Sequence, residues 1–218
     1  MHRKILPPEY NHYISTLFPQ YHQFNDLMVR TARENLPING HVPCLVNLGC
    51  GTGNLEERFL TQERREVRLI GIDHETSSLD YARERLGSKV ELVRAEIPDL
   101  DFPKADIYLA SLTLHHLNGN WQESFEKIAS ALPRGGLFLQ LEMHQAKEGS
   151  TQQKYWQYLR KNLEPDYSFD EWMQESQKVD HFRTLEEEIA LISQLGMNPE
   201  VIAREGPFSL YLARKTRT

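Results

Sequence analysis

The sequence is poor in cysteine and has no long apolar run. Cys44 and Cys50 are the two cysteines among 218 residues, and neither has a CxxC partner, which argues against zinc and redox motifs. We therefore expect the reducing environment of a cytoplasm. No apolar stretch approaches the ~20 residues that a membrane span needs, and the basic N-terminus lacks the apolar segment of a secretory signal. These absences predict a cytoplasmic protein with no membrane partner.

Basic residues are also too few for a protein that coats nucleic acid. Lys and Arg together number 25 against 31 Asp and Glu, and the formal net charge is −6. Because phosphate contacts favour a basic face, this balance disfavours a general nucleic-acid binder. The length is enough for one domain with a buried core. Composition does not separate a monomer from a homodimer.

Strands and helices alternate through the middle of the chain. Apolar runs predict five strands, at 44–48, 67–72, 90–94, 105–110 and 137–142. Helical spacing predicts intervening helices at 54–62, 77–86 and 121–131. A further helix at 185–195 precedes two runs, 199–203 and 208–214, whose short connection allows a hairpin. This order predicts an α/β fold with a mostly parallel sheet and helices on both faces.

Two aromatic-rich segments lie outside that alternation. Residues 9–36 predict one or two helices broken at Pro19, and residues 145–184 contain no clear strand. We therefore predict one domain over 1–218. Its expected parts are an N-terminal helical lid (1–40), a cofactor-binding core (41–142), a helical insertion that serves as a second lid (143–184), and a final helix with a hairpin (185–218).

The glycine-rich turn after the first strand carries most of the functional information. Residues 46–53 read VNLGCGTG, and Asp73 ends the next apolar run. Such a turn lets a ligand approach the backbone, and an acid at the tip of the next strand can accept hydrogen bonds from ribose hydroxyls. Asn54 occupies the last glycine site of the dinucleotide fingerprint, and no Walker loop follows. The pattern therefore indicates a nucleoside cofactor without calling for a diphosphate.

Four segments in order resemble a class I S-adenosylmethionine-dependent methyltransferase, from about residue 42 to 142. They read LVNLGCGTGNLEERFL, LIGIDHETSSLDYARERL, ADIYLASLTLHHL and LPRGGLFLQLE. The resemblance implies a Rossmann-like, seven-stranded sheet whose last two strands are antiparallel. It also implies S-adenosylmethionine as methyl donor, S-adenosylhomocysteine as product, and in-line transfer to a small organic acceptor.

The resemblance also assigns cofactor contacts along the chain. The turn with Gly49, Cys50, Gly51 and Gly53 would pass beneath the methionine part, Asp73 would hold the ribose, and His74 would pack on the adenine. Glu96 and Ile97 would lie beside the adenine amine, and Ser111 and Leu112 near the methyl group. Asn47 stands where the family usually has an acid, so weaker cofactor binding is expected. Purely structural alternatives remain for three of these features: the glycines could only shape a strand-to-helix turn, Asp73 could be a helix N-terminal acid, and Glu96 could be a solvated loop acid.

His115 and His116 follow the fourth strand, at the sheet edge where open α/β folds bind ligands. Either histidine could take a proton from an acceptor, or the pair could wall the pocket. We expect no metal, because adjacent histidines rarely reach one ion and no third ligand is evident. Lid aromatics, with Tyr10, Tyr21, Trp156 and Trp172 as candidates, could line the acceptor pocket or only pack the lid helices.

Two other functions remain open on the sequence alone. PEYN at 8–11 and PFSLYLA at 207–213 are vaguely similar to the carboxy-S-adenosylmethionine synthases of tRNA modification, which need a basic residue for the extra carboxylate. Arg183 or Arg204 could supply it. The other alternative is a non-catalytic regulatory protein that kept the cofactor fold, since fold does not fix function.

Overall fold

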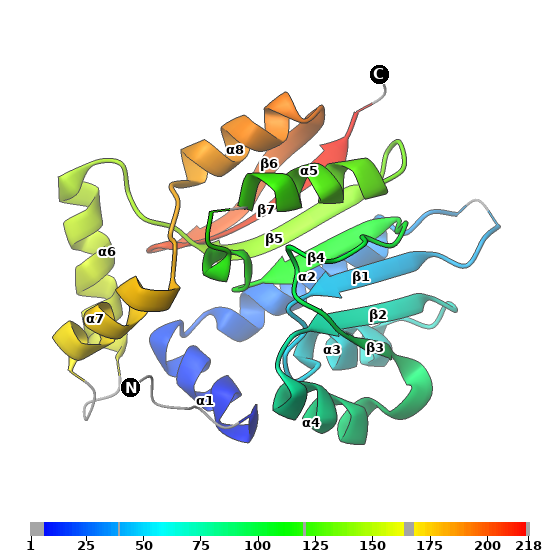
Figure 1. Cartoon of the computed structure of the whole chain (residues 1–218), viewed down its shortest axis with the longest axis horizontal. Helices are drawn as coiled ribbons and strands as arrows, with labels where there is room; N and C mark the ends of the chain where they lie inside the picture. The colour runs from blue at the N-terminus through cyan, green and yellow to red at the C-terminus, as the bar shows by residue number, and fades with distance from the viewer. Residues whose placement is uncertain (1–6, 39, 120, 164–167, 217–218) are drawn as a thin grey trace.

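The computed structural model describes residues 7–38, 40–119, 121–163 and 168–216. Within them, seven strands form one sheet in the order β3-β2-β1-β4-β5-β7-β6 (Figure 1). Strand β7 is antiparallel to both β5 and β6, and the other neighbours are parallel. The strands are β1 (Cys44–Leu48), β2 (Arg68–Asp73), β3 (Glu91–Arg94), β4 (Ile107–Ser111), β5 (Leu137–Met143), β6 (Met197–Glu205) and β7 (Phe208–Lys215). The predicted fold class is confirmed.

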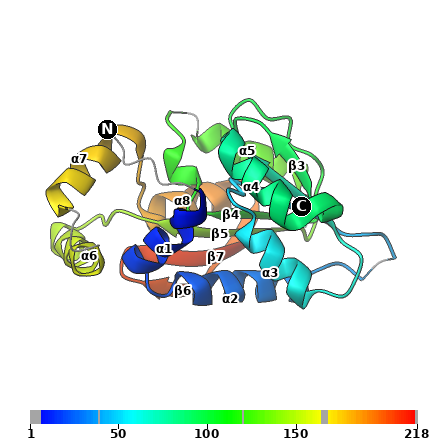
Figure 2. The same cartoon turned by 90° about the horizontal axis from the view of Figure 1, so that it is seen from below.

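Helices cover both faces of this sheet because successive strand residues point in opposite directions. On β1, Leu45 belongs to the apolar cluster beneath the helices α2 and α3, whereas Val46 belongs to the cluster beneath α5 and α8. Figure 2 shows these two pairs on opposite sides of the sheet. The α-helices are α1 (Pro7–Leu17), α2 (Tyr21–Glu34), α3 (Asn54–Gln62), α4 (Thr76–Leu86), α5 (Trp121–Ala131), α6 (Gly149–Asn162), α7 (Phe169–Val179) and α8 (Leu185–Gln194).

The N-terminal segment forms two helices, with the break around Pro19 that the sequence predicts. Phe18, in this break, is fully buried and stacks on Phe208 of β7 at a ring-centroid distance of 4.1 Å. The break therefore docks α2 against the sheet and lets α1 turn toward the carboxyl ends of the parallel strands (Figure 1).

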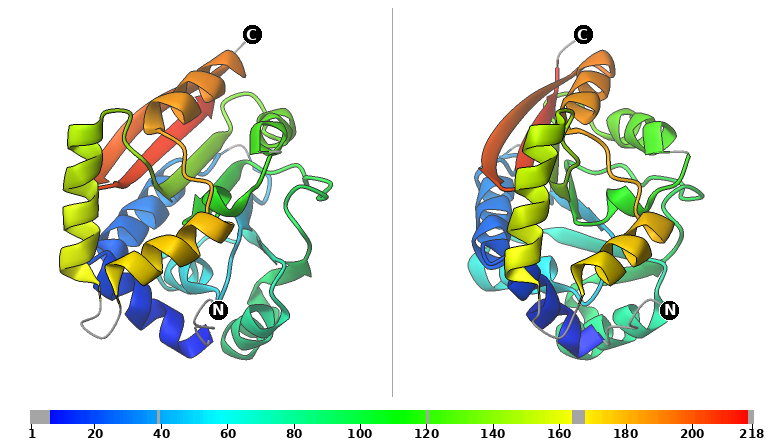
Figure 3. Two further views of the ribbon diagram at one scale, coloured as in Figure 1. Left: turned by 60° about the vertical axis from the view of Figure 1, so that its left-hand side comes forward. Right: turned by 90° about the vertical axis from the view of Figure 1, so that its left-hand side faces the viewer.

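The insertion after β5 forms α6 and α7, which lie beyond the same sheet edge (Figure 3). The indole Nε1–H of Trp172 donates to the Tyr13 hydroxyl of α1 at 2.9 Å. The Tyr158 hydroxyl donates to Gln20 Oε1 at 2.8 Å. These contacts join the two predicted lid segments into one helical layer.

Several predicted boundaries differ from the observed ones. Strand β6 begins at Met197 rather than at 199, because an edge strand tolerates Pro199. Two short 3₁₀ helices, η1 (Gly87–Lys89) and η2 (Leu114–His116), were not predicted. Parts of the predicted segments, 1–6, 164–167 and 217–218, lie outside the described residues. No helix in the described chain is long and apolar enough to cross a membrane.

Candidate active site

A cavity of about 780 Å³ opens at the carboxyl ends of β1, β2 and β4. Parallel α/β sheets bind ligands at this edge, where the strand order reverses. Here the reversal falls between β1 and β4. Helix α1 and the end of α7 contribute Tyr10 and Val179 to its wall. The lid helices therefore complete a pocket whose floor is the sheet edge.

The glycine turn forms one side of the cavity. Gly49 has φ +67° and donates its N–H to the Ile72 carbonyl at 2.8 Å, and a Cβ on it would come within 2.2 Å of Thr113. Gly51 has φ +51° and lines the cavity, and a Cβ there would meet no atom within 4 Å. Gly49 is thus required by packing, whereas Gly51 keeps open the space that a ligand would use.

Asp73, at the tip of β2, closes the same side. Its Oδ2 accepts from the Gly51 N–H at 2.8 Å and its Oδ1 accepts from the Glu75 N–H at 2.9 Å. Each carboxylate oxygen has a second acceptor position. The side chain is nearly buried but lines the cavity. The backbone therefore fixes a carboxylate that can still accept two ribose hydroxyls.

Asn47 and Glu56 form a buried pair behind the turn. Asn47 Nδ2 donates to Glu56 Oε1 at 2.8 Å, and both residues are 2% exposed. Among the described residues, Asn47 Oδ1 and Glu56 Oε2 have no hydrogen-bond partner. Burial, opposed by the Asn47 hydrogen bond, raises the pKa of Glu56 to about 7. Unpaired buried acceptors cost free energy unless a ligand satisfies them.

The opposite side of the cavity comes from the ends of β3 and β4. Ser111 Oγ donates to Asn25 Oδ1 of α2 at 3.3 Å. Leu112 follows with φ +51°, a conformation that a side chain with a Cβ rarely adopts, and its N–H donates to the Leu141 carbonyl at 2.8 Å. Such strain concentrates at functional sites, and here it brings Leu112 to the cavity surface.

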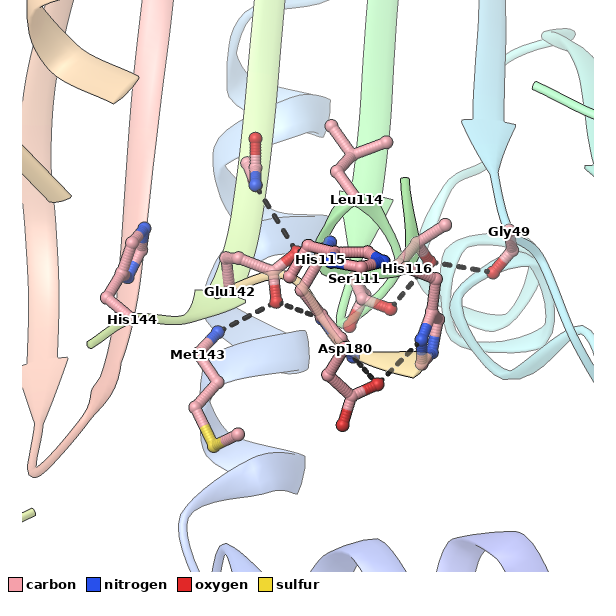
Figure 4. A network of polar contacts seen from close by, with 12 residues as sticks. Gly49, Ser111, Leu114, His115, His116, Glu142, Met143, His144 and Asp180 are labelled. Carbon is pink, nitrogen blue, oxygen red and sulfur yellow. Dashed lines mark hydrogen bonds and ion pairs between the residues drawn. The ribbon is translucent and has the colours of Figure 1, made fainter. Parts of the chain in front are cut away.

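A cluster of two histidines and two carboxylates lies beyond Leu112 (Figure 4). Buried Glu142 accepts from His115 Nδ1 at 2.6 Å, and His115 Nε2 lies 3.8 Å from Asp180 Oδ1. Burial favours the neutral forms of Glu142 and His115, but the attraction between their opposite charges outweighs it. The pKa of Glu142 therefore falls to about 2, and the pKa of His115 rises. His115 is therefore a buried ion-pair partner rather than a free base.

His116 occupies the cavity side of this cluster. Its Nδ1 lies 2.9 Å from Asp180 Oδ1, while the side chain is 54% exposed and lines the cavity. The Ser176 hydroxyl donates to the other oxygen of Asp180. Burial of Asp180 is outweighed by the His116 and Ser176 hydrogen bonds and the charge of His115, so its pKa is lowered. An ionised carboxylate thus fixes one ring nitrogen of His116.

The same cluster has metal-ligand geometry. His115, His116 and Asp180 each offer one ligand atom, and these atoms lie within 4.8 Å of one another. A third candidate ligand, which was not evident in the sequence, is Asp180, the residue directly after α7. Asp180 Oδ1 lies 2.9 Å from His116 Nδ1, yet it has no hydrogen-bond partner of good geometry among the described residues.

Comparison with known proteins supports the cofactor that this geometry fits. Residues 45–136 match the family model of the methyltransferase domain. Human N-acetylserotonin methyltransferase, solved in complex with S-adenosylmethionine, aligns over 100% of this chain and 60% of its own, with 16% identity and a TM-score of 0.60. The chain is thus similar to the methyltransferase domain over residues 45–136, and its fold resembles that of an S-adenosylmethionine-dependent methyltransferase.

Curated sequence relatives of this chain include carboxy-S-adenosyl-L-methionine synthases. The Campylobacter lari protein is 28% identical over 57% of this chain, and the chain spans only 53% of that protein. The protein of Helicobacter pylori strain HPAG1 is 26% identical over 91% of this chain and 87% of its own length.

The cavity contains most of the residues assigned from sequence. Those that line it are Asn47, Gly49, Cys50, Gly51, Asp73, His74, Glu96, Ile97, Ser111, Leu112, His116, Tyr10 and Tyr21. Their contacts with cofactor and acceptor remain predictions. Side chains that sequence reasoning missed include Asn54, Ser78, Thr113, Asn118 and Val179.

Four assigned residues do not line the cavity. Gly53 is the N-cap residue of α3, and a Cβ on it would meet Leu86. His115 points toward Glu142. Trp156 is 39% exposed on α6. Trp172 is turned toward Tyr13. Trp172 thus packs within the lid layer, whereas Trp156 lies on its surface.

Proposed function

We propose that this protein transfers the methyl group of S-adenosylmethionine to an oxygen or nitrogen atom of a small organic acceptor. The observation that carries this proposal is one cavity that holds Gly51 and Asp73 at one side and the Asp180-held His116 at another. Gly51 and Asp73, which form a cradle for the nucleoside, and the candidate base His116 thus face the same cavity.

The walls of the cavity favour a compact acceptor without strong negative charge. Tyr10 and Tyr21 from the N-terminal helices, with Leu112, Leu117 and Val179, give it apolar surface. Among the described residues that line it, none is lysine or arginine. Small-molecule pockets combine apolar walls with a few placed polar groups in this way. A nucleic-acid acceptor would call for a basic approach surface.

The chain's own residues fit the cofactor. Asp73 would accept from the ribose hydroxyls, Asn47 Oδ1 would accept from the ammonium group, and Gly51 would leave room for the methionine part. When bound, S-adenosylmethionine supplies a methyl group on a positively charged sulfur that leaves readily. The protein then needs to align the acceptor and exclude water.

His116 is positioned to remove the acceptor's proton. Asp180 engages Nδ1, so Nε2 is the nitrogen available to an acceptor O–H or N–H. While the bound cofactor supplies the methyl group, Nε2 of His116 would take the proton that the acceptor loses. The ionised Asp180 stabilises the resulting imidazolium, as general base catalysis requires.

The test is formation of S-adenosylhomocysteine with a panel of phenols, carboxylic acids and amines, detected by mass spectrometry. With the acceptor that responds, His116→Asn should lower kcat by about 10²–10⁴-fold, the usual contribution of a general base. His41→Asn is the matched control, because His41 lies away from the cavity beside Asp106. Product formation with any acceptor excludes a non-catalytic regulator. Equal kcat values for His116→Asn and the unaltered protein would refute the role of His116.

A carboxy-S-adenosylmethionine synthase is the second candidate, favoured by the names of the sequence relatives. The two arginines considered for the extra carboxylate do not line the cavity. Arg183 is buried against Glu188 and donates to the Leu114 carbonyl, and Arg204 donates to Tyr155. Mass spectrometry of the sulfonium that co-purifies with the protein separates the candidates, since carboxylation changes its mass.

A further inference from the structure

The buried pair of Asn47 and Glu56 has more charge and hydrogen-bonding capacity than the protein itself uses. Glu56 lies in the first turn of α3 and is 2% exposed, with one carboxylate oxygen bound to Asn47 Nδ2 and the other unpartnered among the described residues. Carboxylates are almost never fully buried without compensation. Glu56 therefore requires a functional explanation.

Glu56 determines which end of the Asn47 amide faces the ligand. An ionised carboxylate only accepts hydrogen bonds, so it binds the amide NH₂ group and leaves Oδ1 unpaired. Asn47 lines the cavity, where a buried acceptor oxygen suits a cationic donor. A protonated Glu56 could instead donate to Oδ1 and withdraw this acceptor from the ligand. The protonation state of Glu56 thus controls the acceptor that Asn47 offers.

The charged groups near Glu56 do not fully compensate its negative charge. Asp73 on β2 disfavours its ionisation, whereas Arg85 on α4 favours it. Arg85 is itself engaged by Glu57 and by the Thr52 carbonyl. A positively charged ligand group beside Asn47 would complete this arrangement.

We propose that Glu56, acting through Asn47, supplies the negative charge that binds the ammonium group of the cofactor's methionine part. This inference rests on the proposed function, because it requires the cavity to bind S-adenosylmethionine. Position 47 has no carboxylate, so the negative charge comes instead from Glu56, which lies behind Asn47 in the cavity wall. Glu56 is a positioning residue, and Asn47 makes the contact.

Relocation of the charge has a consequence for pH. Burial raises the pKa of Glu56 to about 7, so below pH 7 the cofactor's ammonium group must displace a proton from this carboxyl. Linkage then makes the affinity rise with pH up to neutrality, by at most about tenfold per pH unit for one released proton.

The experiment is calorimetric titration of S-adenosylhomocysteine at pH 6.0, 6.75 and 7.5. Glu56→Gln should weaken binding about tenfold or more at pH 7.5 and remove the pH dependence. Asn47→Asp combined with Glu56→Gln moves the carboxylate to position 47 and should restore the affinity. Glu57→Gln is the matched control, because Glu57 is half-exposed on the same helix turn.

A second ligand separates this role from general damage to the site. 5′-Methylthioadenosine has the adenosine and sulfur but no ammonium group, so Glu56→Gln should bind it with unchanged affinity. Equal losses for both ligands, or an unchanged affinity and pH profile for S-adenosylhomocysteine, would overturn the assignment of Glu56. If the unaltered protein binds neither ligand, the proposed function itself fails.

Discussion

Replacing Glu56 by Gln should stabilise the ligand-free protein at alkaline pH. The pKa of this buried carboxyl is raised from 4.5 to about 7. The native state therefore holds a proton that the unfolded state has lost between these values, and stability falls as pH rises through this window. Gln keeps an oxygen that can accept from Asn47 but does not titrate.

The interval between 4.5 and about 7 sets the magnitude. At 1.36 kcal/mol per pKa unit, ionised Glu56 costs about 3 kcal/mol well above pH 7. Part of this cost is already present at pH 5. The free energy of unfolding of Glu56→Gln, relative to that of the unaltered protein, should therefore increase by about 2–3 kcal/mol between pH 5 and pH 8. Urea unfolding of both proteins at the two pH values measures this difference.

The assay needs cofactor-free protein, because a bound ammonium group would stabilise the carboxylate and hide the effect. Glu57→Gln, with its exposed side chain, should show no comparable pH-dependent gain. If the difference between Glu56→Gln and the unaltered protein is the same at pH 5 and pH 8, then Glu56 does not titrate in this window. The reasoning from its burial would then be refuted.

Three further predictions concern the rest of the cavity. Asp180→Asn should lower kcat by about 10–100-fold while S-adenosylhomocysteine affinity is retained, since Asp180 touches His116 and not the cradle; a loss confined to cofactor binding would contradict this. Dialysis against EDTA should leave activity unchanged, because His116 Nδ1 and Asp180 Oδ1 already lie 2.9 Å apart as an ion pair; activity restored by a divalent cation would instead support metal binding by His115, His116 and Asp180. Gly51→Ala should fold yet weaken cofactor binding, because the new methyl group enters the open cradle at φ +51°; calorimetry showing unchanged affinity would place the ligand elsewhere.

The sequence predicted the sheet and which residues of the glycine turn and β2 lie at one edge of it, because both depend on local signals. Strand β1, the glycine turn and Asp73 are contiguous or regularly spaced, and the turn glycines have the positive φ values that their spacing implied. The hairpin across Gly206 was equally readable, since its short connection permits only a local pairing.

The acceptor half could not be predicted because its partners meet only in three dimensions. Asp180 follows α7 in the lid, yet it binds His116 from the loop after β4. His115 does not line the cavity because its side chain binds Glu142 on β5, and no sequence spacing reveals this contact. Nothing in the sequence distinguishes Glu56 from Glu57 in the same helix turn, although its burial behind Asn47 makes Glu56 the unusual carboxylate of the site.

The most direct test of the account is calorimetric binding of S-adenosylhomocysteine to the unaltered protein and to Asp73→Ala. Saturable one-to-one binding to the unaltered protein, with none detectable for a folded Asp73→Ala, is the expected result. Absence of binding to the unaltered protein, or equal binding to both, would contradict the assignment of this cavity to the cofactor.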